Sequence, residues 1–182
     1  MKELSLNILD LAQNSIEAGA KNLIIEILEN QEGYLIIRLT DDGYGMNKEL
    51  LKEVKDPFKT TRTTRKVGLG IPFVEMNAKQ SGGEVTITSN KGKGTIIEAS
   101  FEQNNIDRPP LGKITDTVEM LLIANPLLHL TVRYTSSLGE FILDSNDLYE
   151  SLGPNIRLDE PSVYLWLNEY LKQEFDKVIN TF

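Results

Sequence analysis

The sequence predicts an α/β protein: a two-layer sandwich of helices on a mixed sheet, followed by a small C-terminal α/β appendage. Runs with helical spacing and runs of alternating apolar residues follow one another through residues 1–103. The stretch 103–110 is polar and ends in prolines, which favours irregular structure. We therefore expect a first domain at 1–103, with about four strands and about three helices, and a small unit of unknown role at 104–182.

The first element is an amphipathic helix at 4–16, with apolar residues on one half of the helical wheel and polar residues on the other. Gly19 is a suitable C-terminal stop for this helix. Two β-rich runs at 23–28 and 34–40 follow, and the short polar segment between them predicts a hairpin.

The pattern then continues with a short helix at 47–54, for which Asn47 is the expected N-cap. The stretch 59–66 has no apolar periodicity and is expected to be a loop. Helical spacing returns at 68–80. A pair of strands at 84–88 and 95–101 then flanks a glycine turn.

The C-terminal unit contains a helix at 114–123, strands at 127–134 and 140–144, and a terminal helix at 162–179. One face of the terminal helix is apolar and must pack on something. The residues expected on that face are Val163, Trp166, Leu167, Tyr170, Leu171 and Val178.

Composition narrows the possible functions. The chain has 182 residues, of which 40% are hydrophobic, which is enough for a core. It has no apolar run of the roughly 18 residues that a membrane span needs, and it has no secretion-signal pattern at its start. We therefore expect a cytoplasmic protein without a membrane partner. The absence of cysteine excludes disulfides and thiolate sites, and one histidine excludes a histidine-rich metal cluster.

Charge argues against a nucleic-acid partner, because the net charge is −8 and phosphate-backbone affinity comes from clustered Lys and Arg. The segment 59–66 reverses the sign, since it carries basic residues and no acidic ones. In an acidic protein, such a segment most simply holds a polyphosphate.

Four short motifs occur in order within 1–103: Asp10 with Asn14, Asp41-Asp42-Gly43-Tyr44-Gly45, Gly68-Leu69-Gly70, and Gly92-Lys93-Gly94-Thr95. Together they resemble the N, G1, G2 and G3 boxes of the GHKL family of gyrase, heat-shock chaperone, histidine-kinase and mismatch-repair ATPases. The resemblance covers 1–103 and implies the Bergerat ATP-binding fold, with ATP and Mg²⁺ as cofactors.

Asn14 is the residue that the resemblance implies for metal and ATP binding, because the corresponding Asn of mismatch-repair ATPases coordinates the metal. Mg²⁺ prefers oxygen ligands, which a side-chain amide can supply. Asp10 lies one turn earlier on the same face. The family often has a catalytic Glu there, so the resemblance implies Asp10 as general base, with a shorter reach. For both residues a solvated helix face is the alternative, and for Asp10 a metal-ordering role is another.

Asp41 resembles the G1 aspartate, whose carboxylate accepts a hydrogen bond from the adenine amino group. Gly43 and Gly45 are then expected to let the backbone approach the base. The alternative is an ordinary Asp-Gly turn. Thr95 matches the G3 position, whose hydroxyl lies near adenine, although a hairpin turn explains it equally well.

The phosphates are expected at Gly68, Leu69 and Gly70, where a helix start offers free N–H groups. The segment before these glycines resembles the F box of histidine kinases, and its basic part is expected to form a lid over the phosphates. Its candidate ATP-binding residues are Lys59, Thr60, Thr61, Arg62, Arg65 and Lys66. A docking patch for an acidic partner is the alternative.

Three functions remain open at this stage. The chain is expected to transfer phosphate from ATP to a separate protein, to act as an ATP-gated interaction switch, or to hydrolyse ATP slowly; we place phosphotransfer first. The motif at Asp10 and Asn14 lies at the start of the sequence, so we expect no histidine-kinase dimerisation helices before it. His129 is expected on the polar face of a strand, where a phosphoacceptor role has little support. A homodimer stays open.

Overall fold

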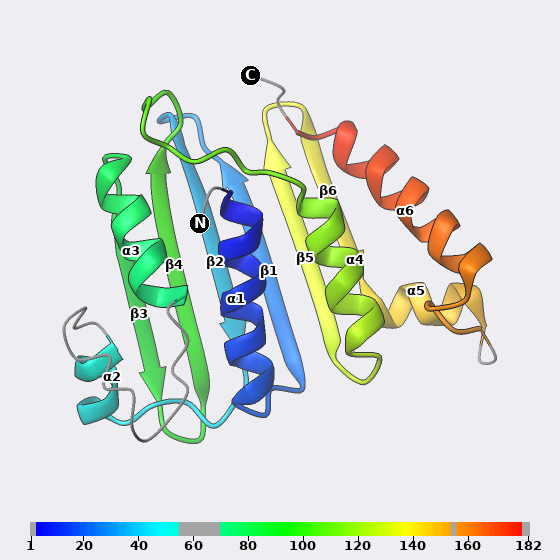
Figure 1. The fold of residues 1–182 in the computed structure, drawn as a ribbon, viewed down its shortest axis with the longest axis horizontal. Helices are drawn as coiled ribbons and strands as arrows, with labels where there is room; N and C mark the ends of the chain where they lie inside the picture. The colour runs from blue at the N-terminus through cyan, green and yellow to red at the C-terminus, as the bar shows by residue number, and fades with distance from the viewer. Residues whose placement is uncertain (1–2, 55–69, 154–155, 180–182) are drawn as a thin grey trace.

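The computed structural model describes residues 3–54, 70–153 and 156–179, and these form one six-stranded sheet with helices packed on it (Figure 1). The strand order is β3-β4-β2-β1-β5-β6. The strands are β1 (Asn22–Glu29), β2 (Tyr34–Asp41), β3 (Val85–Asn90), β4 (Gly94–Glu102), β5 (His129–Ser136) and β6 (Gly139–Asp144). All neighbouring strands pair antiparallel except β1 and β5, which are parallel.

The helices α1, α3 and α4 lie over the same face of the sheet, and α6 packs beside α4 (Figure 1). The described helices are α1 (Leu4–Glu17), α2 (Lys48–Val54), α3 (Gly70–Gln80), α4 (Ile114–Ala124), α5 (Ser145–Leu152) and α6 (Pro161–Asp176). The mixed α/β sandwich predicted from the sequence is therefore confirmed.

Alternation in the strands produces the core on the helix-covered face. In β1, Leu23, Ile25 and Ile27 are almost fully buried, whereas Ile24 and Leu28 are more than a third exposed on the other face. This is the pattern of a sheet with one covered and one open face. The core therefore lies between the sheet and the helix layer.

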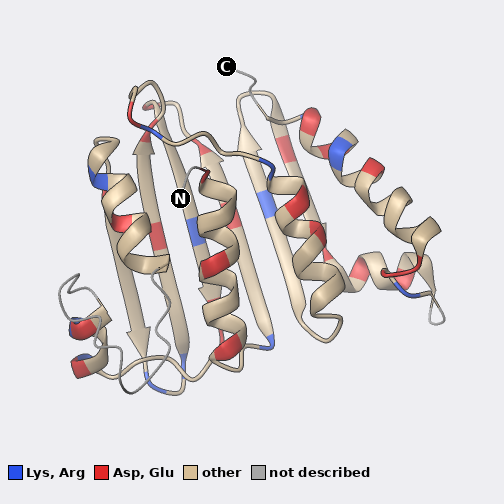
Figure 2. Cartoon of the chain, viewed as in Figure 1, with Lys and Arg blue, Asp and Glu red and all other residues tan. Residues whose placement is uncertain are grey.

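Basic and acidic residues alternate across neighbouring strands of the sheet (Figure 2), and they pair on its open face. Arg38 of β2 pairs with Glu98 of β4 and, at 3.6 Å, with Glu26 of β1. Arg133 of β5 lies 3.6 Å from both Glu26 and Glu140. Neighbouring strands thus compensate each other's charges where the sheet meets solvent, at a modest gain in stability.

The segment before α4 holds the start of α1. The backbone N–H groups of Leu4 and Ser5 donate to the carbonyl oxygens of Pro110 (2.9 Å) and Leu111 (2.8 Å). Thr117 of α4 donates its hydroxyl to the Ser5 carbonyl at 3.1 Å. Two of the free amides at the α1 N-terminus are therefore satisfied by residues more than 100 positions away.

Most sequence-predicted elements agree with the structure, including the Asn47 cap, whose Oδ1 accepts from the Leu50 N–H at 2.8 Å. The sequence reasoning missed α5. It was also wrong about Trp166, which is 42% exposed and stacks on Tyr170 at 5.3 Å between ring centroids. The buried face of α6 runs instead through Leu167, Leu171 and Phe175, because helical periodicity rotates Trp166 outward.

The C-terminal strands add to the same sheet, since β5 pairs with β1. The division of the chain at residue 103 stays a prediction. Across the residues described, no helix is both long and apolar enough to cross a membrane.

Candidate functional site

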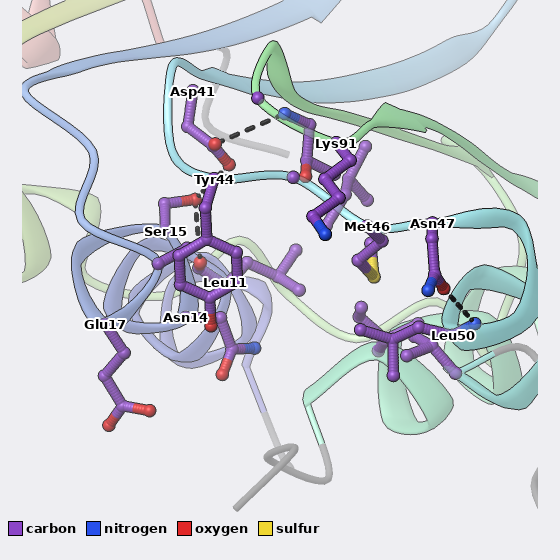
Figure 3. Close-up of a pocket in the computed structure, with 17 residues that line it drawn as sticks. Leu11, Asn14, Ser15, Glu17, Asp41, Tyr44, Met46, Asn47, Leu50 and Lys91 are labelled. Atoms are coloured by element: carbon purple, nitrogen blue, oxygen red, sulfur yellow. Dashed lines mark hydrogen bonds between the residues drawn. The ribbon is translucent and has the colours of Figure 1, made fainter. Parts of the chain in front are cut away.

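A pocket of about 800 Å³ opens between the second half of α1, the loop after β2, α2 and the β3–β4 turn (Figure 3). Its lining is mostly apolar, with contributions from Leu11, Val54 and Ile97, and a few polar side chains face into it. This volume lies within the usual range for small-molecule sites of about 300 to 1,000 Å³. Of the predicted site residues, the structure brings Asn14, Asp41, Gly45 and Thr95 together here.

Asp41 lies at the end of β2 and is only 9% exposed. Its Oδ2 accepts a hydrogen bond from the Ser15 hydroxyl at 2.7 Å. Its Oδ1 accepts from the N–H groups of Gly43 at 2.9 Å and Thr95 at 3.2 Å. An ionised carboxylate has about four acceptor positions. Among the described residues three are filled, so Oδ2 keeps one position for an incoming N–H donor.

Asn14 lines the pocket one helical turn from Asp10, and its side-chain amide makes no hydrogen bond to another described residue. Its oxygen can therefore ligate a cation. The first described residue of α3, Gly70, lies against both positions: a Cβ on Gly70 would be 3.2 Å from Asp10 Cβ and 3.6 Å from Asn14 Nδ2. Asp10 itself is not among the described residues that line the pocket.

The glycines of the second and fourth motifs let backbone segments interlock around Asp41. Gly94 has φ +89°, and a Cβ there would lie 1.9 Å from the Asp41 carbonyl oxygen. Gly45 has φ +61°, and a Cβ there would lie 2.1 Å from the Asn90 carbonyl oxygen. A Cβ on Gly43 would be 2.8 Å from the Ala18 carbonyl oxygen. Glycine is required at these positions because a side chain would clash with the backbone of a neighbouring segment. The approach of these glycines to an adenine base stays a prediction.

Sequence reasoning missed several polar residues of the pocket. Ser15, next to Asn14, orients the Asp41 carboxylate. Ser89 accepts from the Met46 N–H at 2.8 Å, donates to the Gly94 carbonyl at 3.0 Å and lies 2.9 Å from the Thr95 hydroxyl. The Thr95 hydroxyl is therefore engaged by protein. The position of Ser15 directly after Asn14 is a signal in the sequence that could have identified it. No local signal in the sequence marks Ser89.

Two further residues missed by the sequence reasoning lie at the pocket mouth (Figure 3). Tyr44 is 57% exposed and presents its ring at the opening, and Lys91 reaches toward the cavity from the β3–β4 turn. An aromatic face and a cation beside an apolar pocket suit a planar, anionic ligand.

The remaining predicted residues lie outside the described part of the chain. These are Lys59, Thr60, Thr61, Arg62, Arg65, Lys66, Gly68 and Leu69.

The fold and the pocket define a class of protein: a two-layer α/β sandwich with a pocket of nucleotide size between the helix layer and the sheet, where β2 ends and β4 begins. The chain belongs to the family described as histidine kinase-, DNA gyrase B-, and HSP90-like ATPases, whose profile matches residues 2–105. This membership supports ATP binding.

Two kinases of Bacillus subtilis (strain 168) are similar to the family region. Sporulation kinase E is 32% identical over 101 residues, and sporulation kinase C is 32% identical over 99 residues. The matches cover 56% and 54% of this chain but 13% and 22% of the two kinases. The chain thus contains an ATPase domain of this family at residues 2–105, and it spans a small part of the length of these relatives.

Among solved structures, the N-terminal domain of a DNA repair protein has a similar fold, with a TM-score of 0.55 and 16% sequence identity. The match covers 79% of this chain and 53% of that chain. Because residues 1–103 are a smaller share of the chain, the likeness extends into the C-terminal segment.

Proposed function

We propose that the pocket binds magnesium-ATP and that the protein transfers the terminal phosphoryl group to a separate partner protein. The observation that carries the proposal is the open acceptor position on Asp41, inside an apolar pocket of nucleotide size. A carboxylate accepts from the exocyclic amine of adenine and repels the carbonyl oxygen that guanine has there. Similarity to two sporulation kinases supports phosphoryl transfer.

In the proposed reaction a nucleophile of the partner attacks the γ-phosphorus, the bond to the bridging oxygen breaks, and ADP leaves. The acceptor's proton passes to a base or to water. Asn14 would hold the Mg²⁺ through its amide oxygen, and the cation would neutralise charge on the phosphates. Asp10, one turn away, is the proposed base.

Phosphotransfer is tested by incubating the protein and candidate partner proteins with γ-labelled ATP and magnesium. We expect label on one partner protein and, at an ATP concentration that does not saturate the natural protein, far less label when the Asp41→Asn variant replaces it. Label that appears only as free phosphate, with every candidate, would contradict the transfer.

Replacing Asn14 by Ala is expected to weaken binding of magnesium-ATP by about tenfold or more, because an oxygen ligand of the cation is lost. Affinity for ATP in the presence of a chelator should change little. Calorimetric titrations with and without magnesium measure both values. The matched control is Gln13→Ala, an exposed neighbour on α1. Equal losses with and without magnesium would remove Asn14 as the metal ligand.

A second candidate function, an ATP-gated interaction switch, is favoured by the position of Asp10 outside the described lining of the pocket. In such a switch, nucleotide binding changes the partner surface with little or no turnover. Nucleotide-dependent protection of residues 56–70 from hydrogen exchange, without phosphate release or transfer, would favour it.

Asp10→Asn tests whether Asp10 is the base of a slow ATPase. If Asp10 activates water, the variant should lose about 100-fold or more in phosphate release while binding ATP normally. A phosphate-release assay beside a binding titration gives the two values. Unchanged turnover would exclude Asp10 as the base.

A further inference from the structure

A chain of hydrogen bonds links the turn after Asp41 to the C-terminal segment. Asp42 Oδ2 accepts from Asn22 Nδ2 at 2.7 Å. Asn22 Oδ1 lies 3.0 Å from His129 Nδ1. His129 Nε2 lies 2.9 Å from Asp144 Oδ2 and 3.0 Å from Asp144 Oδ1. The chain crosses from the loop after β2, through the starts of β1 and β5, to the junction of β6 and α5.

Asp42 fixes the orientation of the Asn22 amide. Hydrogen bonds from the backbone and the side chain of Asn22 lower the pKa of Asp42, so this carboxylate is ionised and can only accept. The amine side of the Asn22 amide must therefore face Asp42. Its oxygen then faces His129, and an amide oxygen cannot donate. His129 Nδ1 must consequently carry a proton and donate it to Asn22.

The second ring nitrogen, Nε2, faces the carboxylate of Asp144. Burial raises the pKa of Asp144, but hydrogen bonds from His129 and from the Asn146 backbone N–H outweigh this and lower it overall. An ionised Asp144 accepts, so His129 Nε2 also donates. A histidine that donates from both nitrogens is an imidazolium cation. The complete set of hydrogen bonds is therefore formed only by doubly protonated His129.

We propose that protonated His129 is a positioning residue for the nucleotide site. It contacts Asp144 at the β6–α5 junction on one side, and on the other side it is linked through Asn22 to Asp42 beside the nucleotide site. The role toward the nucleotide rests on the proposed function, whereas the hydrogen-bonded bridge does not. Asp42 directly follows the adenine-binding candidate Asp41 and also accepts from the N–H groups of Lys21 at 2.7 Å and Asn22 at 2.9 Å. It thereby fixes the turn that carries Asp41 to the start of β1.

The direction of the pH dependence follows from the hydrogen bonds. The bridge is complete when His129 holds a proton on both ring nitrogens, and it loses one donor when either proton is removed at higher pH. The charged residues on the neighbouring described elements include Asp144 at the end of β6, Asp147 at the start of α5, Asp42 after β2, Lys21 before β1, and Arg133 farther along the same face of β5. Arg133 is paired with glutamates on β1 and β6. The carboxylates at the two ends of the bridge favour the cation.

The bridge itself is tested without nucleotide. His129 is the only histidine in the chain, so its ring signals in a ¹H–¹⁵N spectrum are unambiguous. At about pH 6 we expect two ring N–H signals that are protected from exchange, and at about pH 8.5 only one. Asn22→Leu should remove the Nδ1–H signal alone. A single protected N–H at the lower pH, or no change in Asn22→Leu, would overturn the bridge.

The positioning role is tested by nucleotide affinity at both pH values. Between about pH 6 and 8.5 the natural protein should lose about threefold in magnesium-ATP affinity beyond the loss seen in His129→Gln. The nucleotide's own titration is common to both proteins and cancels. Thr135→Ala, farther along the same face of β5, is the matched control and should behave as the natural protein.

The outcomes distinguish the two proposals. Equal pH responses in the natural protein and His129→Gln would overturn the positioning role, even if the ring N–H signals confirm the bridge. Failure of the natural protein to bind ATP at either pH would overturn the proposed function and the positioning role together. The bridge would then still be decided by the ring signals.

Discussion

Replacing Asp41 by Asn will weaken ATP binding by about 100-fold, equivalent to about 2.7 kcal/mol. The amide oxygen will accept from the N–H groups of Gly43 and Thr95, as Asp41 Oδ1 does now. The amide nitrogen must then take the place of Oδ2, beside Ser15. The Ser15 hydroxyl can rotate to accept from it, so the fold will survive. The adenine amine cannot adapt in this way, because its N–H donor will face the N–H donor of the new amide.

Inosine triphosphate provides the control, since it has a carbonyl oxygen in place of the adenine amine. The natural protein should prefer ATP, whereas Asp41→Asn should prefer inosine triphosphate. Calorimetry with both nucleotides measures the change in preference, and a melting curve checks the fold. Equal losses for both nucleotides, with an unchanged melting temperature, would show that Asp41 does not contact the base.

Gly94→Ala will lower the free energy of unfolding by about 3 kcal/mol or more. The added Cβ would lie 1.9 Å from the Asp41 carbonyl oxygen, so the β3–β4 turn must move away from Asp41. The same movement breaks the contact of Thr95 with the carboxylate. We therefore expect ATP binding to be lost with the stability.

The matched control for Gly94 is Gly92→Ala in the same turn. Gly92 also has a positive φ, of +78°, but a Cβ there meets nothing within 4 Å. Gly92→Ala should therefore lower the free energy of unfolding only by the backbone strain, about 1 to 2 kcal/mol. Urea unfolding of both variants isolates the contribution of the close contact. Equal destabilisation would show that strain alone explains the Gly94 variant.

Sequence reasoning worked where one physical signal dominates. The 3.6-residue and two-residue periods located the long helices and strands, because burial on one face imposes them. The motif order predicted that Asn14, Asp41 and Thr95 share a ligand, and the structure places all three in one pocket. Their roles toward ATP stay predictions.

The parts that sequence reasoning missed depend on contacts between distant segments. The helix α5 is mostly polar and only eight residues long, so its few apolar residues, Leu148, Tyr149 and Leu152, are too few for a periodic pattern to stand out in the sequence. It begins because Asp144 accepts from the Asn146 N–H at 2.9 Å. The pairing of Asn22 with His129 requires the parallel register of β1 and β5, which no local pattern encodes.

The parallel pairing of β1 with β5 also affects how the nascent chain must fold. On one side, β1 pairs with β2, which emerges from the ribosome directly after it. On the other side, β1 pairs with β5, which follows about a hundred residues later. Until then β1 is an exposed sheet edge, open to wrong partners. Synthesis through Ser136 is therefore the earliest point at which this edge can be closed from within the same polypeptide.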